Sequence, residues 1–147
     1  MIEVKAFNKL KLKTILPGKE IYRVFDYQYI GKTWFGETCV FNHTLRLFSS
    51  PFKTKSIAIS IDGLEANELK HVSDIFGIDL GSISNLKNVI ELFGEPHSVY
   101  KKVDDRETYN VYSANKDFEL GFTILNVGQL IYFTMDTIDV SYSMSQQ

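Results

Sequence analysis

The hydrophobic period of this 147-residue chain changes twice, and each change restricts the folds that the chain can adopt. Near the N-terminus apolar and polar residues alternate, as at Ile2, Val4 and Ala6, which is the period of a β-strand with one solvated face. In the middle of the chain the spacing becomes helical, and after Pro96 the alternation returns. This pattern predicts an α+β fold, in which two helices pack on one side of an antiparallel, twisted or bent β-sheet.

Aromatic residues make up 14% of the chain, and they favour strands, so a high β content is expected. The first 61 residues are predicted to be β-rich throughout. The candidate strands before the helices are 2–6, 9–13, 21–30, 33–41, 43–48 and 55–61. The candidate strands after the helices are 97–103, 108–113, 118–125, 130–135 and a short one at 138–142.

The first predicted helix spans about 62–76. Asp62 and Glu65 form a candidate capping box at its start, because an acidic oxygen can accept an exposed backbone N–H three residues on. Gly77 is the candidate stop, since glycine readily adopts the left-handed conformation that ends helices. The apolar face of this helix consists of Leu69, Val72, Ile75 and Phe76.

The second predicted helix spans about 82–93, with Ser82 or Ser84 as its cap. Gly94 stands where a left-handed residue is favoured, and Pro96 prevents the helix from continuing. The apolar stripe of this helix, which is one face wide, comprises Ile83, Leu86, Ile90 and Phe93.

The length of the chain fits one domain, since about 100–200 residues per domain is usual. We predict a single domain, 1–147, with a β-rich part (1–61), a helical pair (62–94) and a C-terminal β-meander (97–142). Cys39 is the single cysteine, so no intramolecular disulfide can form, which fits a reducing compartment. The sequence shows no signal-peptide pattern, and no apolar run reaches about 18 residues, so we expect a cytoplasmic protein that does not span a membrane.

Charge is divided unevenly along the chain, although the net charge is only −2. Residues 1–60 contain 10 basic and 4 acidic side chains, whereas residues 61–147 contain 6 basic and 14 acidic ones. Lys9, Lys11 and Lys13 alternate along a candidate strand, where they would protect a sheet edge from association. The acidic half therefore favours a basic protein partner over a nucleic acid.

The sequence contains no recognisable catalytic set. Cys39 and His43 are four residues apart and could activate a thiolate, but a small buried thiol beside aromatic residues is the simpler interpretation. One cysteine and three scattered histidines lack the short ligand spacing of a zinc site. Asp104, Asp105 and Glu107 lack the spacing of a calcium loop, so a solvated turn is favoured.

Phosphate-binding and hydrolase motifs are also missing. Gly31-Lys32-Thr33 is similar to the end of a phosphate-binding loop, but Asp26 stands where the upstream glycine belongs, and the residues that follow are strand-like. No Gly-x-Ser-x-Gly elbow occurs. We therefore predict no enzymatic activity, no cofactor and no metal.

One segment of the chain resembles a known module. The sequence GSISNLKNVIELFGEP begins at Gly81, and aromatic strands follow it as far as residue 133. Its apolar stripe and Leu92-Phe93-Gly94-Glu95-Pro96 resemble the helix–(Leu/Phe)-Gly-x-Pro–β-meander module of small bacterial proteins. The matching positions further along are Tyr109, Tyr112, Phe122 and Tyr132.

Similar pieces occur in outer-membrane-assembly lipoproteins of the SmpA/BamE type, and in cytoplasmic immunity proteins of contact-dependent growth inhibition and other polymorphic toxin systems. This chain shows no signal peptide and no lipobox cysteine near its start, because Cys39 lies too deep in the sequence. That departure favours the immunity branch. The resemblance then implies a cytosolic protein that binds a toxin domain, the C-terminal domain of a large secreted protein.

These observations together predict an immunity protein that neutralises its cognate toxin by stoichiometric association. A basic nuclease is the expected toxin, because nucleases must grip phosphates. Acidic side chains would then steer the complex, and tyrosines would supply contact area. The predicted partner-binding residues are Glu91, Glu95, Tyr100, Asp104, Asp105, Glu107, Tyr109, Tyr112, Asp117 and Glu119.

Two alternatives remain at this point. The first is a small-ligand or nucleic-acid-binding module, in which the aromatic N-terminal sheet forms the binding surface. The second is an enzyme that uses Cys39 and His43. The aromatic residues that would line the sheet in the first alternative are Tyr22, Tyr27, Tyr29 and Trp34.

Overall fold

The computed structural model describes residues 1–15, 22–25, 37–41, 45–50 and 53–138. Within these ranges eight strands form one sheet, in which every neighbouring pair is antiparallel. The order of the strands is β1-β2-β3-β4-β8-β7-β6-β5. The strands are β1 (Tyr22–Phe25), β2 (Glu37–Phe41), β3 (Leu45–Ser50), β4 (Lys53–Ser60), β5 (Ser98–Val103), β6 (Arg106–Tyr112), β7 (Phe118–Leu125) and β8 (Gln129–Thr137).

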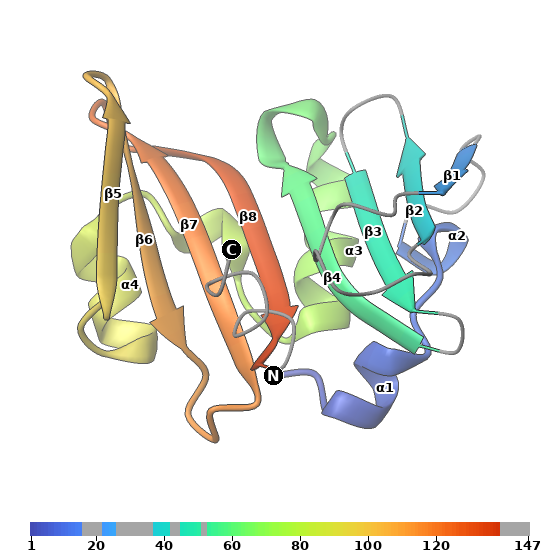
Figure 1. The fold of residues 1–147 in the computed structure, drawn as a ribbon. Helices are drawn as coiled ribbons and strands as arrows, with labels where there is room; N and C mark the ends of the chain where they lie inside the picture. The colour runs from blue at the N-terminus through green and yellow to red at the C-terminus, as the bar shows by residue number, and fades with distance from the viewer. Residues whose placement is uncertain (16–21, 26–36, 42–44, 51–52, 139–147) are drawn as a thin grey trace.

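The sheet consists of two meanders, β1–β4 and β5–β8, which the pairing of β4 with β8 joins into one (Figure 1). In that pairing Ile57 lies opposite Met135 and Ile59 lies opposite Phe133, and all four side chains are buried. The apolar seam therefore continues from one meander into the other, and β1 and β5 form the two edges of the sheet.

The described helices are α1 (Val4–Asn8), α2 (Leu12–Ile15), α3 (Ala66–Phe76) and α4 (Leu86–Phe93), with short 3₁₀ segments at Ile61–Gly63 and Leu80–Ser82. Figure 1 shows α3 and α4 behind the sheet, on the same side of it. Val72 and Phe76 of α3 and Val89 of α4 are buried in the core. The predicted α+β class, with an antiparallel sheet and two helices on one side, is confirmed.

The predicted strands at 2–6 and 9–13 are wrong, because this part of the chain forms α1 and α2. Alternation over only five residues does not distinguish a strand from a short helix. Helix α1 buries Phe7 completely and places the centroid of its ring 4.9 Å from that of Phe118 in an edge-on contact. Burial of a large aromatic ring outweighs the weak local preference for a strand.

The helix ends were predicted better than the helix starts. Gly77 ends α3 in the expected left-handed conformation, and Gly94 ends α4 with a positive φ of 88° but a ψ of −173°, which is outside the left-handed helical region. The cap of α3 is Glu65 rather than Asp62, and Glu68 Oε1 accepts a hydrogen bond of 3.0 Å from the Glu65 backbone N–H. The starts therefore lie a few residues later than predicted, because alternative acceptors stand close together in the sequence.

The start of α4 shows the same shift. Neither Ser82 nor Ser84 caps this helix. Asn85 is the cap, and its side chain accepts a hydrogen bond of 3.0 Å from the backbone N–H of Asn88. Of the apolar stripe predicted for the helix, Ile83 is buried and Phe93 packs against the core, where its ring stacks on that of Phe122 with centroids 5.5 Å apart. The fully buried side chain of α4 is Val89, which the predicted stripe did not include.

The C-terminal meander follows the prediction closely, and β7 has the predicted bounds. Its inward side chains, Leu120 and Phe122, are fully buried, as alternation requires. The predicted strand at 138–142 is not found at Ile138, and 139–142 lie outside the described residues. Of the other predicted strands, the parts at 21, 26–30, 33–36 and 43–44 also lie outside them.

Candidate functional site

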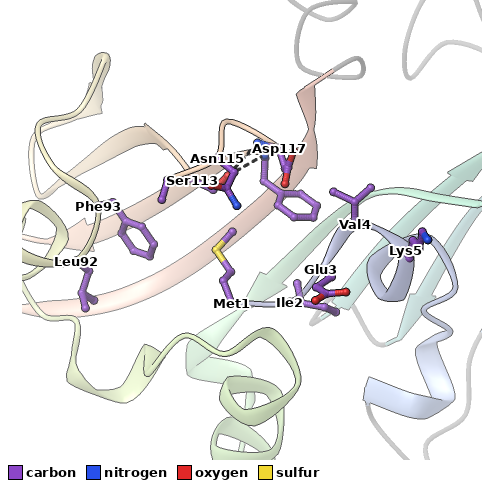
Figure 2. A pocket seen from close by; sticks show the side chains of 12 residues that line it. Met1, Ile2, Glu3, Val4, Lys5, Leu92, Phe93, Ser113, Asn115 and Asp117 are labelled. Atoms are coloured by element: carbon purple, nitrogen blue, oxygen red, sulfur yellow. Dashed lines mark hydrogen bonds between the residues drawn. The ribbon is translucent and has the colours of Figure 1, made fainter.

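A hollow of about 750 Å³ lies between the N-terminal segment, the end of α4 and the loop that joins β6 to β7 (Figure 2). We call it the N-terminal hollow. Apolar and polar groups contribute about equally to its walls. The apolar lining includes Met1, Ile2, Leu92, Phe93 and Phe118, and the polar lining includes Glu3, Lys5, Asn115 and Asp117.

The N-terminal segment forms one wall because it is fixed to the end of α3. The Ile2 backbone N–H donates a hydrogen bond of 2.8 Å to the carbonyl oxygen of Phe76. Gly77 comes next and has a φ of 67°, and a Cβ at this position would lie 2.9 Å from the Cα of Met1. Glycine is therefore required both by the backbone conformation and by the close approach of Met1.

The loop between β6 and β7 forms the opposite wall, and a buried serine organises it. Ser113 Oγ accepts hydrogen bonds of 3.1 Å from the backbone N–H groups of Asp117 and Phe118, drawn as dashed lines in Figure 2. The backbone N–H of Ser113 donates to the carbonyl of Phe118, at 2.9 Å. These bonds hold Asn115 and Asp117 at the rim of the hollow.

The hollow combines exposed apolar surface with charges of both signs. Leu92 is 53% exposed and Met1 is 48% exposed, although both are large apolar side chains. Glu3, Lys5 and Asp117 are exposed, and none of them forms an ion pair with another residue of the described ranges. A site of this kind can accept an apolar side chain and pair polar groups around it.

One of the predicted partner-binding residues lies at the hollow, and two others are close in sequence to its lining residues Leu92 and Phe93. Asp117 lines it directly. Glu91 is exposed on α4 immediately before Leu92, and Glu95 is exposed just after the helix ends. All three carboxylates are exposed to solvent.

Tyr112 and Glu119 lie instead on the face of the sheet opposite α3 and α4, which we call the outer face. The ring of His97 stacks on Tyr112 with centroids 4.1 Å apart, and its Nε2 lies 3.2 Å from Glu119 Oε2. In the strand register Tyr112 is opposite Glu119, which is opposite Asp136 on β8. Asp136 in turn lies opposite Ser56 on β4, whose hydroxyl donates a hydrogen bond to it.

The strand register places the carboxylates of Glu119 and Asp136 side by side on the outer face, and the pKa of Asp136 is shifted there. Burial raises the pKa of Asp136 to about 6. The hydrogen bond from Ser56 opposes this increase, whereas the negative charge of Glu119 adds to it. Like charges directly opposite each other destabilise a strand pair, so this row strains the sheet electrostatically.

The other two predicted tyrosines, Tyr100 and Tyr109, point to opposite faces. Tyr100 pairs with Thr108 on the outer face and is 58% exposed. Tyr109 packs against the core and donates a hydrogen bond of 2.7 Å to Glu107. Burial raises the pKa of Tyr109 to about 12, and the bond to Glu107 and its charge act in the same direction.

The remaining predicted carboxylates belong to the β5–β6 hairpin. Asp104 and Asp105 are exposed at its turn, and Arg106 donates to Asp105 from Nε at 3.0 Å and from Nη2 at 3.2 Å. The Arg106 guanidinium holds the pKa of Asp105 below its usual value. Glu107 lies 3.8 Å from the Nζ of Lys101. These contacts partly neutralise the acidic hairpin.

The structure thus distributes the predicted residues over both faces of the sheet and the hairpin turn, and does not bring all ten into one surface. The sequence pattern does not indicate the N-terminal side of the hollow, because it predicts a strand at residues 2–6, where the structure has the start of α1. It also missed Ser56 and Asp136. A single carboxylate inside an apolar strand was the available signal for Asp136.

The remaining candidate residues offer no second site in the described ranges. Cys39 lies in β2 by its backbone, and His43 lies outside the described residues. The Nε2 of His71 contacts the carbonyl oxygen of Thr14 at 2.9 Å. The described residues contain no cluster of His, Cys, Asp and Glu that could hold a metal ion. Of the aromatic set, Tyr22 is placed only by its backbone in β1, and Tyr27, Tyr29 and Trp34 lie outside the described ranges.

No protein-family model, curated protein or solved structure matches this chain. Among the described helices, none is both long and apolar enough to cross a membrane. The resemblance of residues 81–133 to immunity proteins accordingly stays a prediction.

Proposed function

We propose that this protein binds another protein through the N-terminal hollow, and that it is a cytoplasmic immunity protein whose partner is a toxin domain. The observation that supports this most directly is the exposure of Leu92 and Met1 beside a hollow of about 750 Å³. A single exposed apolar side chain is common on a protein surface, but apolar side chains that gather beside a cavity mark a candidate binding surface. A hollow of this size has room for an anchoring side chain of the partner.

The charges around the hollow suggest the chemistry of that partner. Glu3 and Asp117 belong to the lining, and Glu91 is exposed next to Leu92. Lys5 is the one basic side chain among the described residues that line the hollow. The acidic side chains favour basic residues around the partner's anchor, and charge complementarity of this kind accelerates association.

A stoichiometric inhibitor needs no chemistry of its own. A nuclease toxin grips phosphates with basic residues, so a protein that covers those residues keeps the substrate out. The acidic groups beside the hollow would pair with the basic surface, while the apolar anchor holds the complex together. This mechanism agrees with the resemblance of residues 81–133 and requires no cofactor or metal.

The test is a binding measurement with the polypeptide encoded next to this gene, by calorimetry at two salt concentrations. Leu92→Ser should weaken binding at least tenfold, because it removes half-exposed apolar surface at the hollow. Val127→Ser is the matched control, since Val127 is exposed in the turn at the opposite end of β7. Asp117→Lys should also weaken binding and reduce its dependence on salt.

These measurements distinguish an error in the assigned interface from an error in the proposed function. Equal losses in the Leu92 and Val127 variants would show that the hollow is not the interface. If the unaltered protein failed to bind the neighbouring gene product and to protect cells from it, the immunity function itself would be wrong.

A further inference from the structure

The acidic excess of this protein lies in the helical layer rather than in the C-terminal meander. Residues 61–96 contain seven acidic and two basic side chains, whereas residues 97–138 contain six acidic and four basic ones. In the meander, Asp105, Glu107 and Glu119 each contact a basic or histidine side chain. The exposed acidic side chains of the helical layer are Asp62, Glu65, Asp74, Asp79, Glu91 and Glu95.

A groove of about 630 Å³ runs along α3 within this layer, and we call it the α3 groove. Its apolar lining includes Leu69, which packs against the core, and Ile78, which is buried. Asp74 and Asp79 also line it, together with Lys70. Two carboxylates and one ammonium group therefore surround an apolar floor.

Gly81 keeps the floor of this groove open. A Cβ at position 81 would lie 3.8 Å from Cδ2 of Leu69 and 3.7 Å from Oδ1 of Asp79, which are ordinary contact distances. A methyl group would therefore fit, and a longer side chain would occupy the groove. The backbone N–H of Leu80 donates a hydrogen bond of 3.2 Å to the hydroxyl of Ser73, which fixes this segment against α3.

The α3 groove is separate from the N-terminal hollow. Gly77 lines the groove and Met1 lines the hollow, and their backbones lie in close contact at the C-terminal end of α3. The two cavities nevertheless share no lining residue, so binding in the α3 groove is independent of the function proposed for the hollow.

We propose that the α3 groove binds a basic segment of a protein partner. One apolar side chain of that segment packs on Leu69 and Ile78, and flanking arginine or lysine side chains pair with Asp74 and Asp79. Charge complementarity identifies this occupant, because the groove lies in a layer whose acidic side chains outnumber its basic ones seven to two. Among the described residues that line the groove, Lys70 is the only cation, so a basic segment meets a net negative rim.

The probe is a fluorescein-labelled peptide with a central leucine and two arginines on each side, titrated with the full chain at low salt and followed by fluorescence anisotropy. Gly81→Leu should weaken binding at least tenfold, because its side chain fills the groove. Gly81→Ala is the matched control and should bind as the unaltered protein does. A peptide with serine in place of the leucine should bind at least fivefold more weakly.

Charge reversal gives a second comparison that does not depend on filling the groove. Asp79→Lys should weaken binding at least fivefold, whereas Asp62→Lys changes the net charge equally but alters a side chain outside the groove lining. Equal losses in these two variants would mean a diffuse electrostatic attraction and would overturn the proposal. Failure of the unaltered chain to bind the peptide, or unchanged binding by Gly81→Leu, would also overturn it.

Discussion

The helical layer and the outer face of the sheet both carry carboxylates, but the two regions hold them in different ways. Asp74 and Asp79 stand exposed at the rim of the α3 groove. On the outer face Asp136 is bonded to Ser56 and lies opposite Glu119, which contacts His97. Exposed carboxylates can serve a partner at little cost to the fold, whereas carboxylates packed into the sheet affect stability and its dependence on pH.

The largest expected loss of stability comes from a substitution on the side of the sheet that faces the helices, and it is compared with a substitution on the outer face. Phe122→Ala removes a fully buried ring that contacts Phe93 and Phe133, so the free energy of unfolding should fall by about 3–5 kcal/mol. Tyr112→Ala removes a ring that is 40% exposed and stacks on His97, and it should cost only about 1 kcal/mol.

Urea denaturation of both variants measures this difference. Similar losses in the two variants would show that the outer face is as tightly packed as the core, and the distinction between the two faces would fail.

An intermediate effect is expected at Asp136. Burial raises the pKa of Asp136 to about 6 from its usual value of 3.8, so the folded protein favours the protonated carboxyl. The stabilising contribution of this group is therefore complete below about pH 4 and is lost as the pH rises through 6. Asp136→Asn imitates the neutral form and keeps an acceptor for Ser56, so it should stabilise the protein at pH 8 by about 1–3 kcal/mol.

Thermal unfolding between pH 4 and pH 8 provides the measurement. The variant should be less sensitive to pH than the unaltered chain, and the gain in stability should shrink towards pH 4. Identical pH profiles for the two proteins would show that Asp136 is not perturbed in this way. Asp104→Asn serves as the control, because Asp104 is exposed at a hairpin turn.

The features that the sequence predicts correctly are those that depend on neighbouring residues alone. Alternation identified the strands of the C-terminal meander, and glycine marked the ends of α3 and α4, because both signals are local. The segment that became α1 was misassigned, since burial of Phe7 against Phe118 is a contact across more than a hundred residues. Local pattern contains no information about such a contact.

The candidate site was harder to predict than the fold, for a related reason. The sequence indicates that Asp104 lies in a turn, but not which surface that turn faces. The pairing of Asp136 with Ser56 depends on β4 lying beside β8, which are 80 residues apart at this contact. The N-terminal hollow likewise joins residues 1–5 to the loop before Phe118, so its geometry follows from topology rather than from any motif.

The smallest expected effect on stability belongs to the groove carboxylates. The double substitution Asp74→Asn and Asp79→Asn should change the free energy of unfolding by less than about 0.5 kcal/mol, because both side chains are exposed and neither is in an ion pair within the described ranges. The backbone carbonyl of Asp79, which accepts bonds from Ser82, is retained in this variant. Urea denaturation at pH 7 is the appropriate measurement, with Asp136→Asn examined beside it. If the free energy of unfolding of the double variant fell by more than about 1 kcal/mol, Asp74 and Asp79 would contribute substantially to the stability of the fold. The physical reason for assigning them to a partner would then be lost.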